Sequence, residues 1–320
     1  MTTDAMDRGA ARSVIGFAIR TVLGAADSVR KIAPAPCSVG VPRRAILHTL
    51  LGVTLAAGLA CGGARATLAA EGAGEAADPW PELARDIFDG RPLADGAGLI
   101  AIEMPYRAED AAIVPVTLRT TLSAGDTRAV KAITLVIDQN PAPVAATFQI
   151  GARAGVSTIS TRVRVDSYTD VHAVAELSDG TLYVATTFVK ASGGCSAPTI
   201  KNLDQASADL GQMRFRQFSR ASDGPASGPR EAQIMLRHPN NSGLQRDQLT
   251  LLYIPAFFVR ELRVRQGDDL VLAMEGGISI SEDPNIRFSY VSNGAATFHV
   301  EAVDTSGHVF KGEWPAQPGF

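Results

Sequence analysis

The sequence has few cysteines, few aromatic residues, no excess of either charge and no basic run. Its 320 residues include 3 cysteines and 6% aromatics, and the formal net charge is -3. A nearly neutral chain without basic clusters lacks the electrostatic footprint of a nucleic-acid-binding protein, so no such partner is expected. Cys-x-x-Cys-His is absent, which excludes an attached c-type haem, and no glycine-rich strand-to-helix loop indicates a nucleotide site.

The sequence also lacks the residue spacings of metal sites and the motifs of common catalytic centres. Four of the histidines, His172, His238, His299 and His308, follow the N-terminal region, and none has metal-ligand spacing to another His, Cys or carboxylate. No nucleophile-elbow motif occurs. We therefore expect neither a bound cofactor nor a catalytic centre in this chain. A thiol-dependent enzyme with Cys195 as nucleophile and His238 as base is the enzymatic alternative.

The first 66 residues have the pattern of an export signal. Arg43 and Arg44 precede an apolar stretch, residues 49–60, that is too short to span a membrane comfortably. Ala64-Arg65-Ala66 supplies a cleavage site, and the paired arginines resemble a twin-arginine signal after a long n-region. The alternative is an uncleaved anchor helix. We expect a cleavable signal peptide over residues 1–66, a periplasmic location, and no membrane span after cleavage.

Cleavage near residue 66 leaves one thiol, Cys195, because Cys37 and Cys61 are removed. A lone cysteine in an oxidising compartment cannot form an internal disulfide, so it is either incidental or bonds to something outside the chain. Its neighbours are Gly193, Gly194, Ser196, Ala197 and Pro198. Glycines permit many backbone conformations, and ten extended residues reach about 30 Å. The sequence predicts a flexible arm that carries Cys195 out of the fold.

Most of the remaining chain is predicted to form strands. A helix is expected over residues 79–88, after a disordered leader (67–79). Strands are expected at 99–104, 112–120, 130–138, 145–150, 157–166, 171–177 and 182–189. A second group lies at 232–236, 257–264, 270–274, 286–291, 296–303 and 308–314. Turn signals at 178–181 and 304–307 separate strand pairs. The expected fold class is all-β, with two immunoglobulin-like β-sandwich domains that pack on each other.

A connector separates the two groups of strands. Apolar residues at Leu203, Ala206, Leu210, Met213 and Phe218 permit a short helix, and the end of the connector is rich in Ser, Gly and Pro. The expected division is therefore a first sandwich at 80–198, a linker at 199–229 and a second sandwich at 230–320.

Two stretches resemble known carrier proteins. Gly193-Gly194-Cys195 after a β-sandwich resembles the carrier arm of SoxY, which holds sulfur intermediates on a cysteine during periplasmic thiosulfate oxidation. Residues 235–244, with a His-Pro-x-x-x-Gly-Leu cluster, resemble SoxZ, its partner, as do 253–262, 271–279, 285–290 and 302–307. The order of the two, with Gly-Gly-Cys-Ser-Ala-Pro at the arm, is similar to a fused carrier family found beside quinoprotein (PQQ-dependent) dehydrogenases.

The resemblance implies a carrier that holds an adduct on Cys195, with sulfur in the adduct, and presents it to periplasmic redox enzymes. The implied partners are a quinoprotein dehydrogenase, a c-type cytochrome or Sox-type enzymes. The alternative is an accessory module that docks such a dehydrogenase or its cytochrome without using the thiol. This sequence departs from SoxY, in which glycines follow the cysteine and end the chain. Here Pro198 stiffens that side, and the arm is tethered at both ends.

Overall fold

The structure is a computed structural model and describes residues 78–198, 208–218 and 228–317. The expected signal peptide lies outside the described residues, as does nearly all of the expected leader. The same holds for residues 199–207 and 219–227 of the expected linker. Within the described part of the chain, no helix is both long enough and apolar enough to cross a bilayer.

The chain from residue 78 starts with a helix that covers one end of a sheet. Helix α1 spans Trp80–Ile87 and follows Pro79, a favoured residue at a helix start. It ends before Asp89 and Gly90, which both have positive φ, as the sequence predicts. Phe88 is buried with Val174 and Leu182, so the helix covers the outer face of the strands that carry them.

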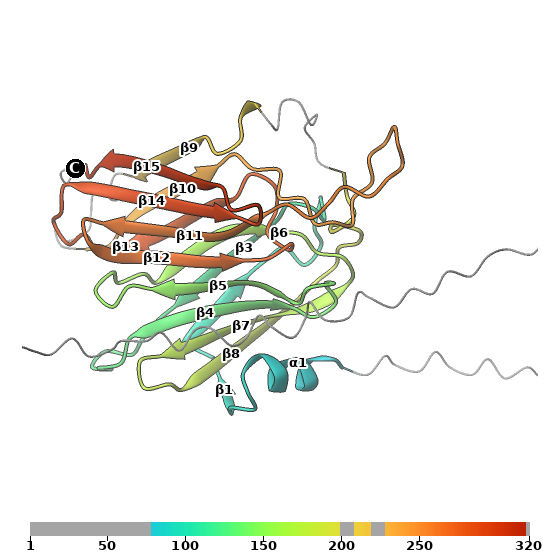
Figure 1. The fold of residues 1–320 in the computed structure, drawn as a ribbon. Coiled ribbons are helices and arrows are strands. Elements are labelled where there is room, and N and C mark those ends of the chain that lie inside the picture. Colours follow the sequence, from blue (N-terminus) through green and yellow to red (C-terminus); the bar gives the residue numbers. More distant parts are fainter. Residues whose placement is uncertain (1–77, 199–207, 219–227, 318–320) are drawn as a thin grey trace, which may run out of the picture. The chain divides into compact units, whose positions relative to one another are not determined.

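The all-β fold class is confirmed: strands dominate the described residues and form two sheets (Figure 1). The first sheet contains, in spatial order, β1 (Leu93–Asp95), β8 (Leu182–Val189), β7 (Thr169–Leu177), β4 (Val130–Ile137), β5 (Val144–Ile150), β12 (Asp269–Gly276), β11 (Val259–Gln266), β14 (Thr297–Asp304) and β15 (Val309–Pro315). The second contains β2 (Ile100–Glu103), β3 (Val114–Thr120), β6 (Thr158–Val163), β13 (Asn285–Tyr290), β10 (Arg230–Leu236) and β9 (Met213–Phe218).

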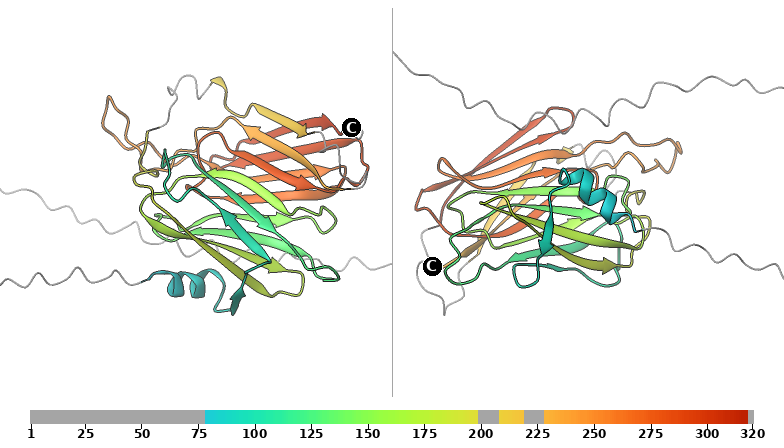
Figure 2. Two further views of the ribbon diagram at one scale, coloured as in Figure 1. Left: turned by 180° about the vertical axis from the view of Figure 1, so that it is seen from behind. Right: turned by 90° about the horizontal axis from the view of Figure 1, so that it is seen from below.

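The strands form where apolar residues alternate with polar ones. In β14, each second residue is buried, and β3 follows the same period. Successive strand side chains point to opposite faces, so this alternation buries one face of each strand against the other sheet. The facing side chains of both sheets form a shared core. Figure 2 shows the strands of the two sheets from two further sides. β7 is buried on nearly every residue because α1 covers its outer face.

The two halves of the chain are joined edge to edge by strand pairing. In the first sheet, β5 pairs antiparallel with β12, with Phe148 opposite Met274. In the second sheet, β6 pairs with β13, with Ile159 opposite Phe288. Both sheets therefore run without interruption from the first half of the chain into the second. The halves contact each other, as expected, and the contact includes backbone hydrogen bonds that join their strand edges in both sheets.

The connector differs in part from its expected form. Residues Met213–Phe218 form strand β9 and pair with β10, so the helical expectation is wrong for this stretch. Phe215 lies 4.9 Å from Phe298 and 5.5 Å from Trp314, measured between ring centroids. These contacts with the second half require an extended backbone, and the neighbouring strand β10 supplies the hydrogen bonds that hold it.

Candidate functional site

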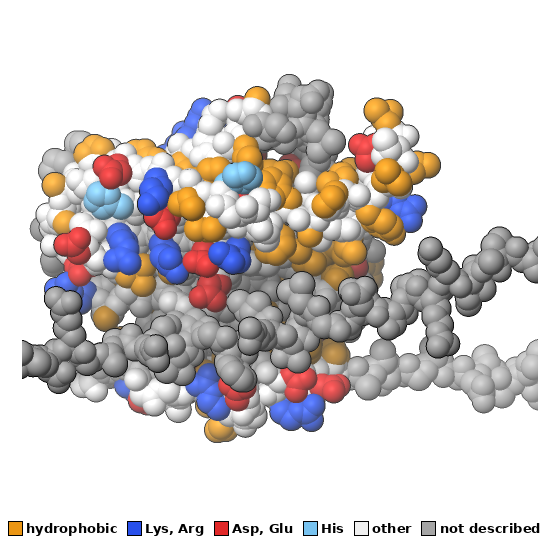
Figure 3. All heavy atoms as spheres, viewed as in Figure 1, with side chains coloured by type: hydrophobic (Ala, Val, Ile, Leu, Met, Phe, Trp, Pro, Cys, Tyr) orange, Lys and Arg blue, Asp and Glu red, His pale blue; other side chains and the backbone are white. Residues whose placement is uncertain are grey.

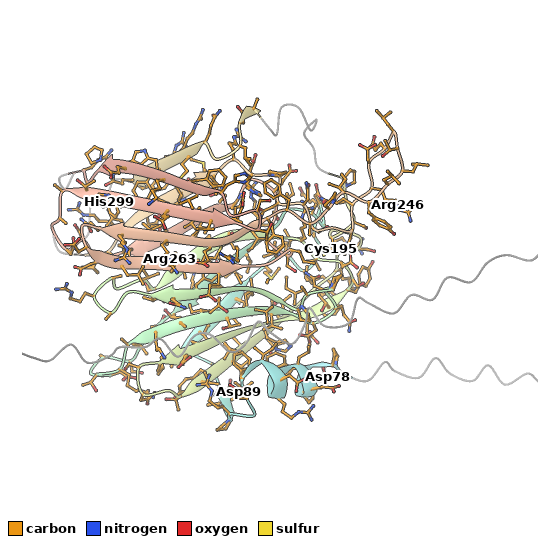
Figure 4. The ribbon with its side chains drawn as sticks, viewed as in Figure 1. Asp78, Asp89, Cys195, Arg246, Arg263 and His299 are labelled. Atoms are coloured by element: carbon orange, nitrogen blue, oxygen red, sulfur yellow. The ribbon has the colours of Figure 1, made fainter. Side chains whose placement is uncertain are left out.

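Cys195 lies in the loop that leaves the first half of the chain after β8. Its side chain is buried, with 0% exposure, although the sequence predicts a thiol that projects from the fold. Figure 4 labels Cys195 and, on the neighbouring loop, Arg246. Ser196 and Pro198 are exposed and Ala197 is half-buried. The structure therefore has a closed site, in which the backbone turns the cysteine inward and leaves the residues after it at the surface.

Gly193 and Gly194 position the cysteine by close packing. The Gly193 N–H donates to the Asp166 carbonyl oxygen at 2.7 Å, and the Gly194 N–H donates to that of Val165 at 3.0 Å. Gly193 has φ +76°, a conformation that glycine adopts without strain. A Cβ on Gly194 would lie 2.1 Å from the carbonyl oxygen of Ala111. The glycines thus allow a close approach of backbones and, in this closed site, do not form a flexible arm.

The loop is held from both halves of the chain. Asp166, from the first half, accepts the Cys195 N–H on Oδ1 at 3.3 Å. From the second half, Ser242 Oγ donates to the Cys195 carbonyl oxygen at 2.5 Å, and Gln245 Nε2 donates to that of Ala197 at 3.1 Å. We call residues 242–245 the clamp. Ser242 and Gln245 are buried, so water competes little for these bonds.

Burial keeps the Cys195 thiol protonated. Loss of hydration raises the pKa of Cys195 to about 12, and the negative charge of Asp166 adds to the rise. The positive charge of Arg164 acts in the opposite direction but does not cancel the effect of burial. The thiolate is the nucleophilic form of cysteine, so the closed site suppresses thiol chemistry at neutral pH. Reaction at Cys195 requires that the loop opens.

His238 does not pair with Cys195. His238 is buried, and its Nδ1 accepts the Asn240 N–H at 3.1 Å while its Nε2 lies 3.6 Å from Asp304 Oδ2. Burial lowers the pKa of His238, which favours the neutral imidazole. Within the described residues the two side chains share no hydrogen bond. The structure therefore supplies no Cys–His pair of the kind that activates a nucleophile.

Sequence reasoning missed four residues of this site: Arg164, Asp166, Ser242 and Gln245. Arg164 and Asp166 lie in the predicted strand 157–166, where polar and apolar residues alternate as in many strands and nothing marks these two as functional. Ser242 lies inside the His-Pro-x-x-x-Gly-Leu cluster, which marked the family resemblance but not a contact with Cys195. In the described part of the chain, no three His, Cys, Asp or Glu side chains are grouped to hold a metal ion.

Comparison with known proteins assigns both halves of the chain. Residues 84–195 match the family model of the sulfur oxidation protein SoxY, and residues 220–315 match that of the sulphur oxidation protein SoxZ. The chain is a SoxY–SoxZ fusion. The SoxY match ends on Cys195 itself, and the clamp belongs to the SoxZ domain. The loop that carries the thiol is therefore held across the boundary between the two domains.

Several solved structures are similar to parts of the chain. The sulfur carrier protein SoxY from Chlorobium limicola f thiosulfatophilum is 26% identical, over 35% of this chain and 91% of that chain, with a TM-score of 0.30. A superoxide reductase (neelaredoxin) from Ignicoccus hospitalis is 15% identical over 29% of this chain and 79% of that chain, with a TM-score of 0.23. Among curated protein sequences, none matches significantly.

Proposed function

We propose that the protein is a periplasmic covalent carrier that binds a sulfur-containing intermediate on Cys195 and presents it to partner redox enzymes. One observation carries the proposal: the SoxY match ends on the only thiol that remains after the expected cleavage. The similar SoxY from Chlorobium limicola is itself described as a sulfur carrier protein. Sox-type enzymes, a quinoprotein dehydrogenase and a c-type cytochrome are the proposed partners.

The carrier cycle has two states of the cysteine loop. In the closed state, burial and the clamp keep the thiol neutral and out of contact with oxidants. In the open state, the thiolate forms a bond to its cargo by thiol–disulfide exchange or a related transfer. Closure of the loop then protects the adduct on its way between enzymes. A closed state that protects the thiol and an open state that reacts together explain why a carrier cysteine is buried.

Mass spectrometry tests the proposal directly. The protein is purified from its native cells after growth on thiosulfate and on alcohols, and the peptide that contains Cys195 is analysed without reduction. We expect a mass increase on Cys195 under at least one of these conditions. Cells that carry Cys195→Ser should lose growth on the same substrate. An unmodified peptide in every condition, together with normal growth of the Cys195→Ser strain, would falsify the carrier function.

A second candidate function, docking of a redox partner without use of the thiol, is favoured by one surface feature. The loop after the clamp displays Leu249, Leu251 and Leu252, which we call the leucine tip. Leu249 is 93% exposed, and hydrophobic side chains are visible on this projecting loop in Figure 3. Asp247 accepts the N–H groups of Leu249 and Thr250, so the turn presents the leucines in a defined conformation.

Two variants separate the two functions in cells. Cys195→Ser removes the thiol, whereas replacement of all three tip leucines by serine removes the apolar surface. Docking alone predicts that the serine tip abolishes pathway function while Cys195→Ser leaves it unchanged. The carrier function predicts that Cys195→Ser abolishes it. Gln248→Ala, at an exposed position on the same loop, is the control for nonspecific damage.

A further inference from the structure

The leucine tip is an apolar surface that projects from the body of the molecule. In the described part of the chain, its residues are the most exposed of the large hydrophobic ones: Leu249 at 93%, Leu252 at 70% and Leu251 at 67%. Figure 3 shows hydrophobic side chains on this loop, which stands clear of the sheets. Leu251 has φ +59°, a left-handed conformation that is unfavourable for leucine and that marks functional loops more often than others. Apolar side chains displayed together in this way are normally covered by a partner or a membrane.

The backbone of the tip supplies hydrogen-bond acceptors for its own N–H groups. Asp247 Oδ1 accepts the N–H groups of Leu249 at 3.1 Å and Thr250 at 2.7 Å. The Leu251 N–H donates to the Asp247 carbonyl oxygen at 2.9 Å. The Leu252 N–H donates to Thr250 Oγ1 at 3.4 Å. The N–H groups of all three leucines are thus satisfied within the loop, which suits an apolar phase, where no water accepts an unpaired donor.

Arg246 and Tyr253 form the base of the tip. They lie opposite each other at the two ends of the loop, in an isolated antiparallel bridge. Arg246 Nη2 donates to the Tyr253 hydroxyl at 3.0 Å, and the guanidinium lies 4.7 Å from the centre of the Tyr253 ring. Both side chains are exposed, and Figure 4 labels Arg246 on this loop. Arginine and tyrosine combine an apolar body with a polar end, and both are suited to the level of lipid headgroups.

We propose that the leucine tip enters the boundary between the headgroups and the acyl chains of a lipid bilayer, with Arg246 and Tyr253 at the level of the headgroups. The charge of Arg246 adds attraction to anionic lipids. Insertion to this shallow depth leaves the carbonyl oxygens of the tip within reach of water. The chain therefore has a peripheral membrane-binding site that is independent of the carrier function.

A protein with an apolar pocket is the other occupant that fits exposed leucines, and the docking function of the previous subsection requires it. Protein interfaces also form about one hydrogen bond per 100–200 Å². The three leucines have no unpaired N–H group left for such bonds, because Asp247 and Thr250 already accept them. A lipid phase needs none of these bonds, so the hydrogen bonding of the tip favours the bilayer.

Vesicle sedimentation measures the binding. Protein from native cells is mixed with vesicles of phosphatidylcholine and phosphatidylglycerol in equal parts, and with vesicles of phosphatidylcholine alone. We expect the wild type to sediment with both, and more strongly with the mixed vesicles. The serine tip (Leu249→Ser, Leu251→Ser and Leu252→Ser) should bind both at least about 10-fold more weakly, since burial of one leucine side chain contributes that factor. Arg246→Gln should bind about 5-fold more weakly to the mixed vesicles only.

Three control variants should bind like the wild type. Gln248→Ala changes an exposed polar residue of the same loop. Val291→Ser removes exposed apolar surface outside the tip, next to the end of β13. Cys195→Ser removes the thiol, so failure of the carrier function leaves vesicle binding unchanged and the two failures are distinguishable. All variants keep the same residues before position 78, so any contribution of that region to binding is equal.

A fluorescent probe at the tip reports the depth of insertion. Leu249→Trp is introduced into protein with Trp80→Phe and Trp314→Phe, so that it is the single tryptophan. Its emission should shift to shorter wavelength when vesicles are added, and brominated acyl chains should quench it. An emission that vesicles leave unchanged would place the tip outside the bilayer.

Two outcomes of the sedimentation experiment overturn the inference. One is vesicle binding that the serine tip does not weaken. The other is a wild-type protein that sediments with neither kind of vesicle. If the serine tip then still abolishes pathway function in cells, the occupant of the leucine tip is a protein.

Discussion

At the residue scale, Gly194 sets how deeply Cys195 is buried. Any side chain at this position meets backbone atoms of Ala111 and Val165, which cannot shift as a flexible side chain would. Gly194→Ala should lower the free energy of unfolding by about 1–3 kcal/mol or displace the loop. In either case labelling of Cys195 by a thiol reagent such as DTNB should accelerate. Ser192→Ala, at an exposed position two residues earlier, is the control. Unchanged stability and labelling would contradict the close packing.

The titration of Cys195 is a second prediction at this scale. Burial raises its pKa to about 12 from an ordinary value of 9.0, so the folded protein keeps the proton that the unfolded chain releases. The stability contributed by the closed thiol is therefore complete below pH 9 and is lost as the pH rises from 9 towards 12. The rate of alkylation by iodoacetamide should keep rising past pH 9. A plateau at pH 9 would indicate an exposed thiol.

Gly193 and Gly194 also show what the sequence alone cannot predict at the residue scale. Gly-Gly predicts conformational freedom, and that freedom serves either motion or a close approach between backbones. The choice depends on Ala111 and Val165, which are distant in the sequence and carry no signal of the contact. The sequence singles out Cys195 as a candidate because it is the lone thiol of the expected mature chain. The burial of Cys195 and the charge of Arg164 beside it could not be predicted.

At the element scale, the clamp holds the cysteine loop closed. Ser242 and Gln245 each donate one hydrogen bond to the loop, and a buried hydrogen bond contributes about 0.5–1.5 kcal/mol. Ser242→Ala and Gln245→Ala should each speed labelling of Cys195 by roughly 2- to 10-fold at neutral pH, as the closed state loses that stabilisation. Thr250→Ala lies on the same loop without a bond to the cysteine segment and should label at the wild-type rate. Equal rates in all three variants would exclude the clamp.

Strand prediction succeeded where alternation is regular and failed where two periods compete. The expected segment 296–303 corresponds to β14, Thr297–Asp304, because every second residue is apolar. Residues Met213–Phe218 fit a helical pattern as well as a strand, and the sequence alone does not decide between them. The decision comes from β10, which offers its hydrogen-bonding edge to this segment. Such a partner is a tertiary property, so a local pattern does not contain it.

At the scale of the whole molecule, the shared sheets should make both domains unfold together. Trp80 lies in the SoxY half, and Trp314 lies in the SoxZ domain. Two single variants therefore report on one half each. Trp80→Phe leaves Trp314 as the reporter of the SoxZ domain, and Trp314→Phe leaves Trp80 as the reporter of the SoxY half. Phe148→Ala, at the β5–β12 junction, should destabilise the protein by about 3–5 kcal/mol, and both reporters should detect the same shift in urea. If the urea unfolding transition reported by Trp314 were unchanged by Phe148→Ala, the two domains would unfold independently.

The junction itself could not be predicted from the sequence. The order of a SoxY-like and a SoxZ-like segment was readable from motifs, and each half has the alternation of a sandwich. Pairing of β5 with β12 joins segments that are far apart in the chain, and nothing in Phe148 or Met274 identifies its partner. The alternation of residues in β5 is equally compatible with pairing to any other apolar strand edge.

The β5–β12 junction has a consequence for synthesis of the chain. Ile150 pairs with Leu272, and a ribosome needs about 6–24 s to add the roughly 120 residues between them. During that interval the nascent SoxY domain presents open strand edges to every other chain in its surroundings. In a two-gene arrangement, those edges would wait for a separately made partner found by diffusion. The fusion replaces that search with a fixed delay, and the molecule covers its own aggregation-prone edges as soon as its second half emerges.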